Sequence, residues 1–214
     1  MPQVININSQ FTKLDRVESG HNELTMLVRD CIAQVPAAQK KLYDQYAPAA
    51  YGIIKRYMYN DDATAQEILN DSFYKILTKL DQYTFQGAFE GWIRRIIVHT
   101  CINFLKKYKK FNESMDLTYA TNLQSKDETV PSMMQGKQVV ECIRILPLGY
   151  KTVLNLYAIE GFSHREIGLM LDIEESTSRS QYTRAKAMLE TLLIKKRIIE
   201  KPKEDFNWLA VFPK

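Results

Sequence analysis

The chain has 214 residues, enough for one or two domains, and its 45% hydrophobic content is ordinary for a globular protein. Its three cysteines lie far apart without a CxxC pair, and only three histidines are present, which argues against a zinc site or a disulfide framework. No stretch of about 18 apolar residues and no signal-peptide pattern occurs, so we expect no membrane insertion. The net charge of +4 is modest, so its placement matters more than its size.

The composition favours an all-α protein, with two helical domains joined by a flexible linker. Glycine is scarce, at eight residues, and no alternating apolar runs bounded by turn residues are present. We expect residues 1–22 to form an N-terminal arm and residues 23–111 to form the first domain. Apolar residues recur at helical spacing as far as Leu80, with a turn at 60–62 that offers capping residues.

An acidic pair lies in the second helix of this domain. Glu67 and Asp71 are four residues apart and therefore share one helical face, beside the apolar stripe that contains Phe73. Two interpretations are open: a solvated helix face, or a docking surface for a basic partner helix. The pair alone favours the solvated face.

An aromatic loop with a glycine, residues 85–89, precedes a long helix predicted over residues 90–110. Aromatic side chains next to a basic helix can stack on unpaired bases, although Phe85, Phe89 and Trp92 are equally well explained as core. From Trp92 onward the helix has basic residues and no acidic ones. Its polar residues suit phosphate or base-edge contacts, or a solvated face; they are Arg94, Arg95, His99, Asn103, Lys106 and Lys107.

Residues 112–136 are rich in Ser, Thr, Asn and Asp, carry net negative charge and show little periodicity, so we expect a linker. Residues 137–197 then form the second domain, in which helices end before Pro147 and Gly161. Residues 198–214 are expected to be a C-terminal tail. An acidic connector thus separates two basic blocks, and basic blocks attract phosphates.

The second domain ends in a predicted helix-turn-helix. Ser163 and Glu166 have the spacing of a capping box, residues 172–175 form the turn, and Ser176 or Thr177 can cap the next helix. In that helix a buried stripe is expected at Tyr182, Ala185, Leu189 and Leu192. The residues mostly off the stripe, placed as in a recognition helix, are Arg179, Ser180, Thr183, Arg184 and Lys186. The alternative is an amphipathic hairpin with a solvated basic face.

The chain offers no cluster of carboxylates with histidine, no glycine-rich phosphate loop and no metal-ligand spacing. We therefore expect neither an enzyme nor a cofactor. Two separate basic, DNA-reading surfaces in one chain favour a promoter reader, and the alternative is a stand-alone helix-turn-helix regulator. The regulator predicts a ligand or receiver domain ahead of the DNA reader, and the first half shows no alternating strand–helix pattern for one.

Successive segments resemble the motifs of bacterial extracytoplasmic-function (ECF) sigma factors, the small members of the sigma-70 family that keep regions 2 and 4. The segments are LYDQYAPAAYGIIKRYM, DDATAQEILNDSFYKIL, FEGWIRRIIVHTCINFLKKYKK, ILPLGYKTVLNLYAIEGFSHREIGLMLDI and ESTSRSQYTRAKAML. They occur in the family's order and spacing over residues 23–196. The resemblance implies a subunit that binds core RNA polymerase, finds a promoter and opens the duplex.

The resemblance also implies roles for particular residues. Core polymerase would be bound, at the clamp of its largest subunit, by Glu67, Asp71 and Phe73. The −10 element would be captured as unpaired strand by Phe85, Phe89, Arg95, His99, Asn103, Lys106 and Lys107. The −35 element would be read as duplex by Ser176, Thr177, Arg179, Ser180, Thr183, Arg184 and Lys186. The acidic linker would run toward the polymerase active site and the RNA exit path.

Further partners implied by the family are the flap of the second-largest polymerase subunit and an inhibitory anti-sigma factor, and the implied location is the cytoplasm. The sequence departs from the family at two site positions. His99 stands where many relatives have asparagine, which makes a different −10 preference plausible. Ser178 stands where valine is usual, so a hydroxyl replaces an apolar contact in the recognition helix.

Overall fold

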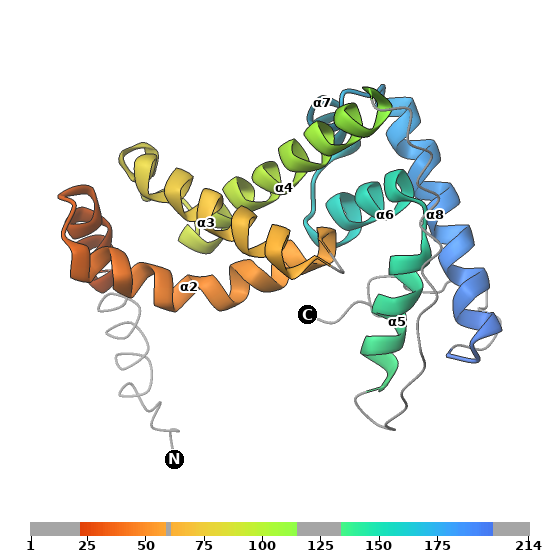
Figure 1. The fold of residues 1–214 in the computed structure, drawn as a ribbon, viewed down its shortest axis with the longest axis horizontal. Coiled ribbons are helices and arrows are strands. Elements are labelled where there is room, and N and C mark those ends of the chain that lie inside the picture. Colours follow the sequence, from red (N-terminus) through yellow and green to blue (C-terminus); the bar gives the residue numbers. More distant parts are fainter. Residues whose placement is uncertain (1–21, 59–60, 115–133, 199–214) are drawn as a thin grey trace, which may run out of the picture. The chain divides into compact units, whose positions relative to one another are not determined.

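The computed structural model describes residues 22–58, 61–114 and 134–198, and its elements within these ranges are helices joined by turns, without a strand. This confirms the all-α prediction. The chain divides into two compact units, and the division falls after Cys101, inside a long helix. Figure 1 traces the order of the elements along the chain.

In the first half, residues 22–32 are helical, and α2 (Pro36–Tyr57), α3 (Asp62–Thr78), a short 3₁₀ turn η1 (Leu80–Gln82) and α4 (Phe89–Ser114) follow. In the second half, α5 (Met134–Ile145), α6 (Leu148–Leu154), a π-helical turn η2 (Asn155–Ile159), α7 (His164–Leu171) and α8 (Glu175–Lys195) complete the fold.

The core of the first unit forms where α2 packs against α3. The apolar residues at helical spacing along α2, from Leu42 to Tyr57, are buried apart from the half-buried Tyr43, whose ring lies 4.6 Å from that of Phe73 on α3. On α3 the predicted stripe is also buried, except for the half-buried Leu77. Burial of both stripes explains why two helices of modest intrinsic stability hold together.

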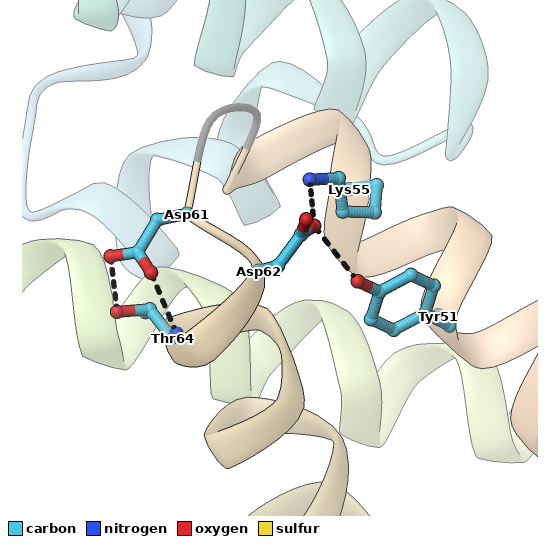
Figure 2. A network of polar contacts seen from close by, with 5 residues as sticks. All are labelled: Tyr51, Lys55, Asp61, Asp62 and Thr64. Atoms are coloured by element: carbon cyan, nitrogen blue, oxygen red, sulfur yellow. Dashed lines mark hydrogen bonds and ion pairs between the residues drawn. The ribbon is translucent and has the colours of Figure 1, made fainter.

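The turn between α2 and α3 is stabilised by two neighbouring carboxylates (Figure 2). Asp61 is the N-cap of α3, and its Oδ1 accepts a hydrogen bond of 2.8 Å from the Thr64 backbone N–H. Asp62 Oδ1 accepts bonds from Lys55 Nζ at 2.6 Å and from Tyr51 Oη at 3.0 Å, both on α2. The turn therefore caps one helix and ties it to the other, as its capping residues predicted; its residue 60 lies outside the described ranges.

The start of α4 is held by aromatic packing. Phe89 is only 1% exposed, and its ring lies 5.5 Å from that of Tyr46 and 4.9 Å from that of Tyr83. Trp92 stacks on Phe89 with ring centroids 5.8 Å apart. Burial and a hydrogen bond to the Glu90 carboxylate raise the pKa of Tyr46 to about 12. For Phe89 and Trp92, the interpretation as core is the one that the packing supports.

The second unit has its own core, contributed by α5, α6 and α8, with α7 packed on α8. Ala185 and Leu189 of the predicted α8 stripe are fully buried, whereas Tyr182 and Leu192 are half-buried. Leu193, outside the predicted stripe, is also fully buried. The buried hydrophobic residues that form this core are Val139, Cys142, Ile143, Leu146, Leu154, Ala185, Leu189 and Leu193.

One predicted helix start was wrong. Helix α8 begins at Glu175 with Glu174 as its N-cap, so neither Ser176 nor Thr177 caps it. Helix also covers residues 112–114 and 134–136, at the two ends of the expected linker. The rest of that linker, the N-terminal arm apart from residue 22, and the tail beyond residue 198 lie outside the described residues.

Candidate nucleic-acid interface

The helix-turn-helix begins with the predicted capping box. The Glu166 backbone N–H donates to Ser163 Oγ at 3.2 Å, and Glu166 Oε2 accepts from the Ser163 N–H at 2.8 Å. These two bonds satisfy donors that the first turn of α7 leaves unpaired. At the other end, Asp172 adopts a left-handed conformation with φ 58°, which stops α7 and turns the chain toward α8.

A polar pair lies inside the junction of α7 and α8. His164 Nδ1 is 2.9 Å from Ser178 Oγ, and both side chains are buried, at 7% and 0% exposure. The imidazole stacks on Tyr157 of η2 with centroids 4.2 Å apart and planes 11° apart, and Tyr182 lies on its other flank at 5.7 Å. The serine that replaces the family's valine is therefore a hydrogen-bonding partner of His164.

Most of the predicted duplex-reading residues form one exposed face of α8, called here the α8 face. Ser176, Arg179, Ser180, Thr183 and Arg184 are exposed, while Thr177 and Lys186 are half-buried. The Arg179 guanidinium forms an ion pair with Glu175 one turn earlier, and Lys186 Nζ lies 5.7 Å from the centre of the Tyr182 ring. The α8 face thus combines hydroxyl groups and cations, which suit base edges and phosphates respectively.

A second exposed polar face lies on α4, called here the α4 face: Arg95, His99, Asn103, Lys106 and Lys107, each exposed. From Arg95 to Asn103 the steps are four residues, and Lys106 and Lys107 follow Asn103 by three and four, so one broad side of the helix carries them all. Partial desolvation of the imidazole ring, with help from the nearby cations of Arg95 and Lys79, lowers the pKa of His99 below its usual value. A neutral imidazole offers one hydrogen-bond donor and one acceptor to a base.

The aromatic loop before α4 divides between core and surface. Phe85 is half-buried and adopts a positive φ of 59°, with its ring 5.0 Å from that of Tyr83. Tyr83 Oη in turn donates to the carbonyl oxygen of Gly87 at 2.9 Å, which shapes the loop. Phe89 is buried beneath it and supports the loop from the core, and its expected contact with an unpaired base stays a prediction.

The acidic face of α3 is exposed as the pair Glu67 and Asp71, and Lys75 Nζ lies 2.6 Å from Asp71 Oδ2. Phe73 is only 3% exposed and packs on Tyr43, so it supports the acidic face from the core, and its expected role in polymerase binding stays a prediction. Sequence reasoning missed Tyr74, which is 69% exposed beside Asp71. The spacing could have indicated it, because Tyr74 follows Asp71 by three residues and Glu67 by seven and so lies on the same side of the helix.

Within the described residues, no group of His, Cys, Asp or Glu side chains is arranged to hold a metal ion. None of the described helices combines the length and apolar character that a membrane crossing requires. What the described part of the chain presents, therefore, is helical faces: basic on α4 and α8, acidic on α3.

These faces coincide with two family matches. Residues 42–111 match the Sigma-70 region 2 family, and residues 136–189 match the Sigma-70, region 4 family. The first range covers α3 and most of α2 and α4; the second covers α6, α7 and most of α5 and α8. The chain is a sigma-70 family factor of the ECF type. It is accordingly an RNA polymerase sigma factor, which binds core polymerase and promoter DNA and directs transcription initiation.

Similar proteins agree with this family. The ECF RNA polymerase sigma-E factor of Haemophilus influenzae is 25% identical over 174 residues, covering 74% of this chain and 91% of its own. SigE of Mycolicibacterium smegmatis, also an ECF sigma factor, is 24% identical over 193 residues, covering 87% and 74%. The fold is similar to that of the sigma factor RpoE in its complex with the anti-sigma factor NepR from Bartonella quintana, with a TM-score of 0.50, 16% identity and coverage of 72% and 96%.

Membership of this family sets the stand-alone regulator aside, because region 2 occupies the place where that hypothesis requires a ligand or receiver domain. Sigma factors are non-catalytic initiation factors as a family. The fold, the family and the role in transcription initiation were thus predicted from the sequence.

Proposed function

We propose that this sigma factor divides promoter recognition between its two basic helix faces. The α8 face reads the −35 element as intact duplex, and the α4 face captures the −10 element as an unpaired strand. The observation that carries the proposal is that each unit contributes to an exposed helix face in which cations alternate with hydroxyl, amide or imidazole groups. Cations position a protein on phosphates, while the neutral groups distinguish bases.

On α8 the proposed readers are Arg179, Ser180, Thr183 and Arg184, with Ser176, Thr177 and Lys186 as flanking contacts to the backbone. The first four lie in the N-terminal half of the helix, which is the half that a recognition helix directs at base edges. Arg184, which is exposed, suits guanine or phosphate. The capped, closely packed α7 supports the orientation of α8.

On α4 the proposed base contacts are His99 and Asn103, with Arg95, Lys106 and Lys107 on phosphates. Phe85 at the loop is the aromatic available for stacking, since it is half-buried where Phe89 is fully covered. Stacking of a base on an aromatic side chain contributes about 1–3 kcal/mol. That contribution is comparable to the few kcal/mol that extruding a base costs.

For core polymerase we propose the acidic face of α3, with Glu67, Asp71 and Tyr74 in contact and Phe73 supporting them from beneath. An exposed aromatic ring beside two carboxylates suits a basic, partly apolar helix such as one of a clamp coiled coil. We further assign region 2 to residues 23–111, region 4 to residues 137–197 and the connecting linker to the residues between them. Region 4 is proposed to contact the flap of the second-largest subunit.

Two further parts of the proposal rest on the family. The chain has no catalytic role of its own, and it works in the cytoplasm with the polymerase. An anti-sigma factor is a proposed regulator, supported by the Bartonella quintana RpoE structure, which contains one. Such a partner would cover the faces that DNA and polymerase use.

Run-off transcription with purified core polymerase tests the proposal. Promoters are selected from a library randomised at both elements, with core polymerase alone as the control. We expect transcripts only when this chain is added, from promoters that share two conserved elements. In parallel, the chain alone is titrated with the selected duplexes. Full sequence-selective binding without polymerase, together with no transcription, would overturn the division of labour proposed here.

A further inference from the structure

The packing between α7 and α8 contains one feature that apolar packing alone does not require. His164 and Ser178 are buried polar side chains, and their Nδ1 and Oγ atoms are 2.9 Å apart. Ile167, Gly168 and Met170, the other buried residues of α7, are apolar or lack a side chain. A buried polar pair is costly to separate, so it favours one arrangement of its two helices over neighbouring ones.

The position of Ser178 on α8 makes this arrangement relevant to DNA. Successive residues of an α-helix are about 100° apart, so Ser180 points about 200° away from Ser178. Thr183 and Arg184 lie on the same outward side, whereas Tyr182, Ala185 and Leu189 share the inward side with Ser178. Any rotation of α8 that shifts Ser178 therefore shifts the α8 face by the same angle.

The imidazole itself is held from several directions. Tyr157 stacks against one ring face at 4.2 Å, and Tyr182, one turn after Ser178, flanks it at 5.7 Å. His164 is also the first residue of α7, directly after the capping serine, so its backbone is held by the capping box. A donor or acceptor held this firmly can orient its partner, because a hydrogen bond depends on direction as well as distance.

We propose that His164 and Ser178 are positioning residues for promoter recognition: their buried hydrogen bond sets the rotation of α8 and thereby the bases that this sigma factor accepts at the −35 element. The inference rests on the proposed function of the α8 face. An apolar contact at the same place would hold the helices together but would tolerate small rotations, since apolar attraction has no preferred direction. The polar pair does not tolerate them.

The test is base preference at a randomised −35 element, measured as run-off transcription by the reconstituted holoenzyme. His164→Phe keeps a ring to stack on Tyr157 and removes Nδ1, and Ser178→Ala removes the hydroxyl. Each is expected to reduce discrimination between the best and the average −35 sequence by about tenfold, the scale of one well-placed base contact. The double variant is expected to lose no more than either single one, because a single bond is being removed.

Ser72→Ala is the matched control. Ser72 is a fully buried serine of α3 whose Oγ has no hydrogen-bond partner, so its replacement should leave the −35 preference unchanged. Circular dichroism checks that each variant is folded at the assay temperature. If a single variant is unfolded, the double variant is used instead, because it leaves neither polar group unpaired. Its −35 base preference then tests the inference.

Two results would overturn the inference: a wild-type base preference in the double variant, or an equal fall in transcription from all −35 sequences, which a purely structural role predicts. Arg184→Ala, assayed in the same selection, distinguishes failure of the positioning role from failure of base reading by the α8 face. If Arg184→Ala alters the preference and the His164–Ser178 variants do not, only the positioning role is wrong. If Arg184→Ala also leaves it unchanged, the proposed reading by α8 fails.

Discussion

Gly168 of α7 and Ile173 in the following turn are so close that a β-carbon on Gly168 would lie 2.8 Å from the Ile173 carbonyl oxygen. The Ile173 backbone N–H also donates to the Gly168 carbonyl oxygen at 3.0 Å. The turn of the helix-turn-helix therefore closes over a residue without a side chain, and the obstacle to a larger residue is backbone, which has little freedom to move.

Gly168→Ala is accordingly expected to destabilise the second unit by about 1–3 kcal/mol, the usual cost of overpacking. Thermal unfolding of the full chain, followed by circular dichroism, measures it. Gly52→Ala in α2 is the control, since a β-carbon there meets nothing within 4 Å. That change should be neutral or stabilising by up to about 1 kcal/mol. Equal melting of both variants would contradict the tight turn.

Asp61→Ala should remove the N-cap of α3 and cost about 1 kcal/mol, since the Thr64 backbone N–H loses its acceptor. Asp61→Asn should restore most of that loss, because asparagine caps a helix about as well as aspartate. Urea unfolding of the three proteins gives the comparison. If the alanine and asparagine variants are equally unstable, the charge of Asp61 matters more than its capping bond.

Asp71→Lys should weaken binding of core polymerase at least tenfold while leaving the chain folded, because it reverses a charge on the proposed docking face. The lost ion pair with Lys75 is exposed and contributes only about 0.3–0.5 kcal/mol to stability. Asp44→Lys on α2 is matched, since Asp44 also forms an exposed ion pair with the lysine four residues away. A pull-down of core polymerase in which both variants bind like wild type would remove α3 from the interface.

Arg184→Ala is expected to reduce transcription from promoters with a −35 element by about tenfold, the scale of losing one arginine contact to a base. Promoters that depend on the −10 element alone should respond less. Lys195→Ala, at the last turn of the same helix, removes an equally exposed cation away from the proposed reading half. If the lysine change is the more damaging one, the α8 face has been assigned to the wrong end. Binding of core polymerase should be normal in both.

Stability is expected to fall as the pH is lowered from about 7 to about 5.5. Burial lowers the pKa of His164; the nearby cation of Arg179 lowers it further, and the carboxylate of Glu175 opposes this in part. Desolvation also lowers the pKa of His99. The unfolded chain, in which histidine titrates near 6.5, therefore takes up protons before the folded one does. The stability that the two neutral histidines contribute is fully present above about pH 6.5, the pKa in the unfolded chain, and is lost as the pH falls below it.

Thermal unfolding at several pH values checks this expectation, with His164→Phe as the comparison. The variant should depend less on pH in this window, because one of the two histidines is gone. The carboxylates of Asp61 and Asp62 do not contribute here, because hydrogen bonds lower their pKa values further below this window. An unchanged pH dependence in His164→Phe would show that its imidazole is not buried as described.

Local spacing explains what could be predicted from the sequence. The Ser163–Glu166 box, the Asp61 cap and the α2 and α3 stripes each depend on residues a few positions apart, so their patterns are visible without a fold. The start of α8 was misplaced because two good capping residues follow the true cap, Glu174, and the chain reaches helical geometry before them.

The remaining differences depend on contacts between distant residues. Phe73 and Phe89 carry the same apolar signal whether they are core or contact residues, and only the packing on Tyr43 and Tyr46 distinguishes the two. The partner of His164 is fourteen residues away on another helix. Helical spacing cannot predict such a pair, although the sequence does show serine at position 178, where valine is usual in the family.

The π-helical turn η2 has a consequence for how this protein can change over time. Its wider winding, closed by the bond of 2.9 Å from the Glu160 N–H to the Asn155 carbonyl oxygen, carries Tyr157 to the stacking position against His164. Deleting one residue here would restore ordinary α-helical winding and remove the wider turn that brings Tyr157 against the imidazole. The length of this segment is thus under tighter constraint than the identity of its outward side chains. A descendant that lost one residue here would need a new stacking partner for the His164 imidazole.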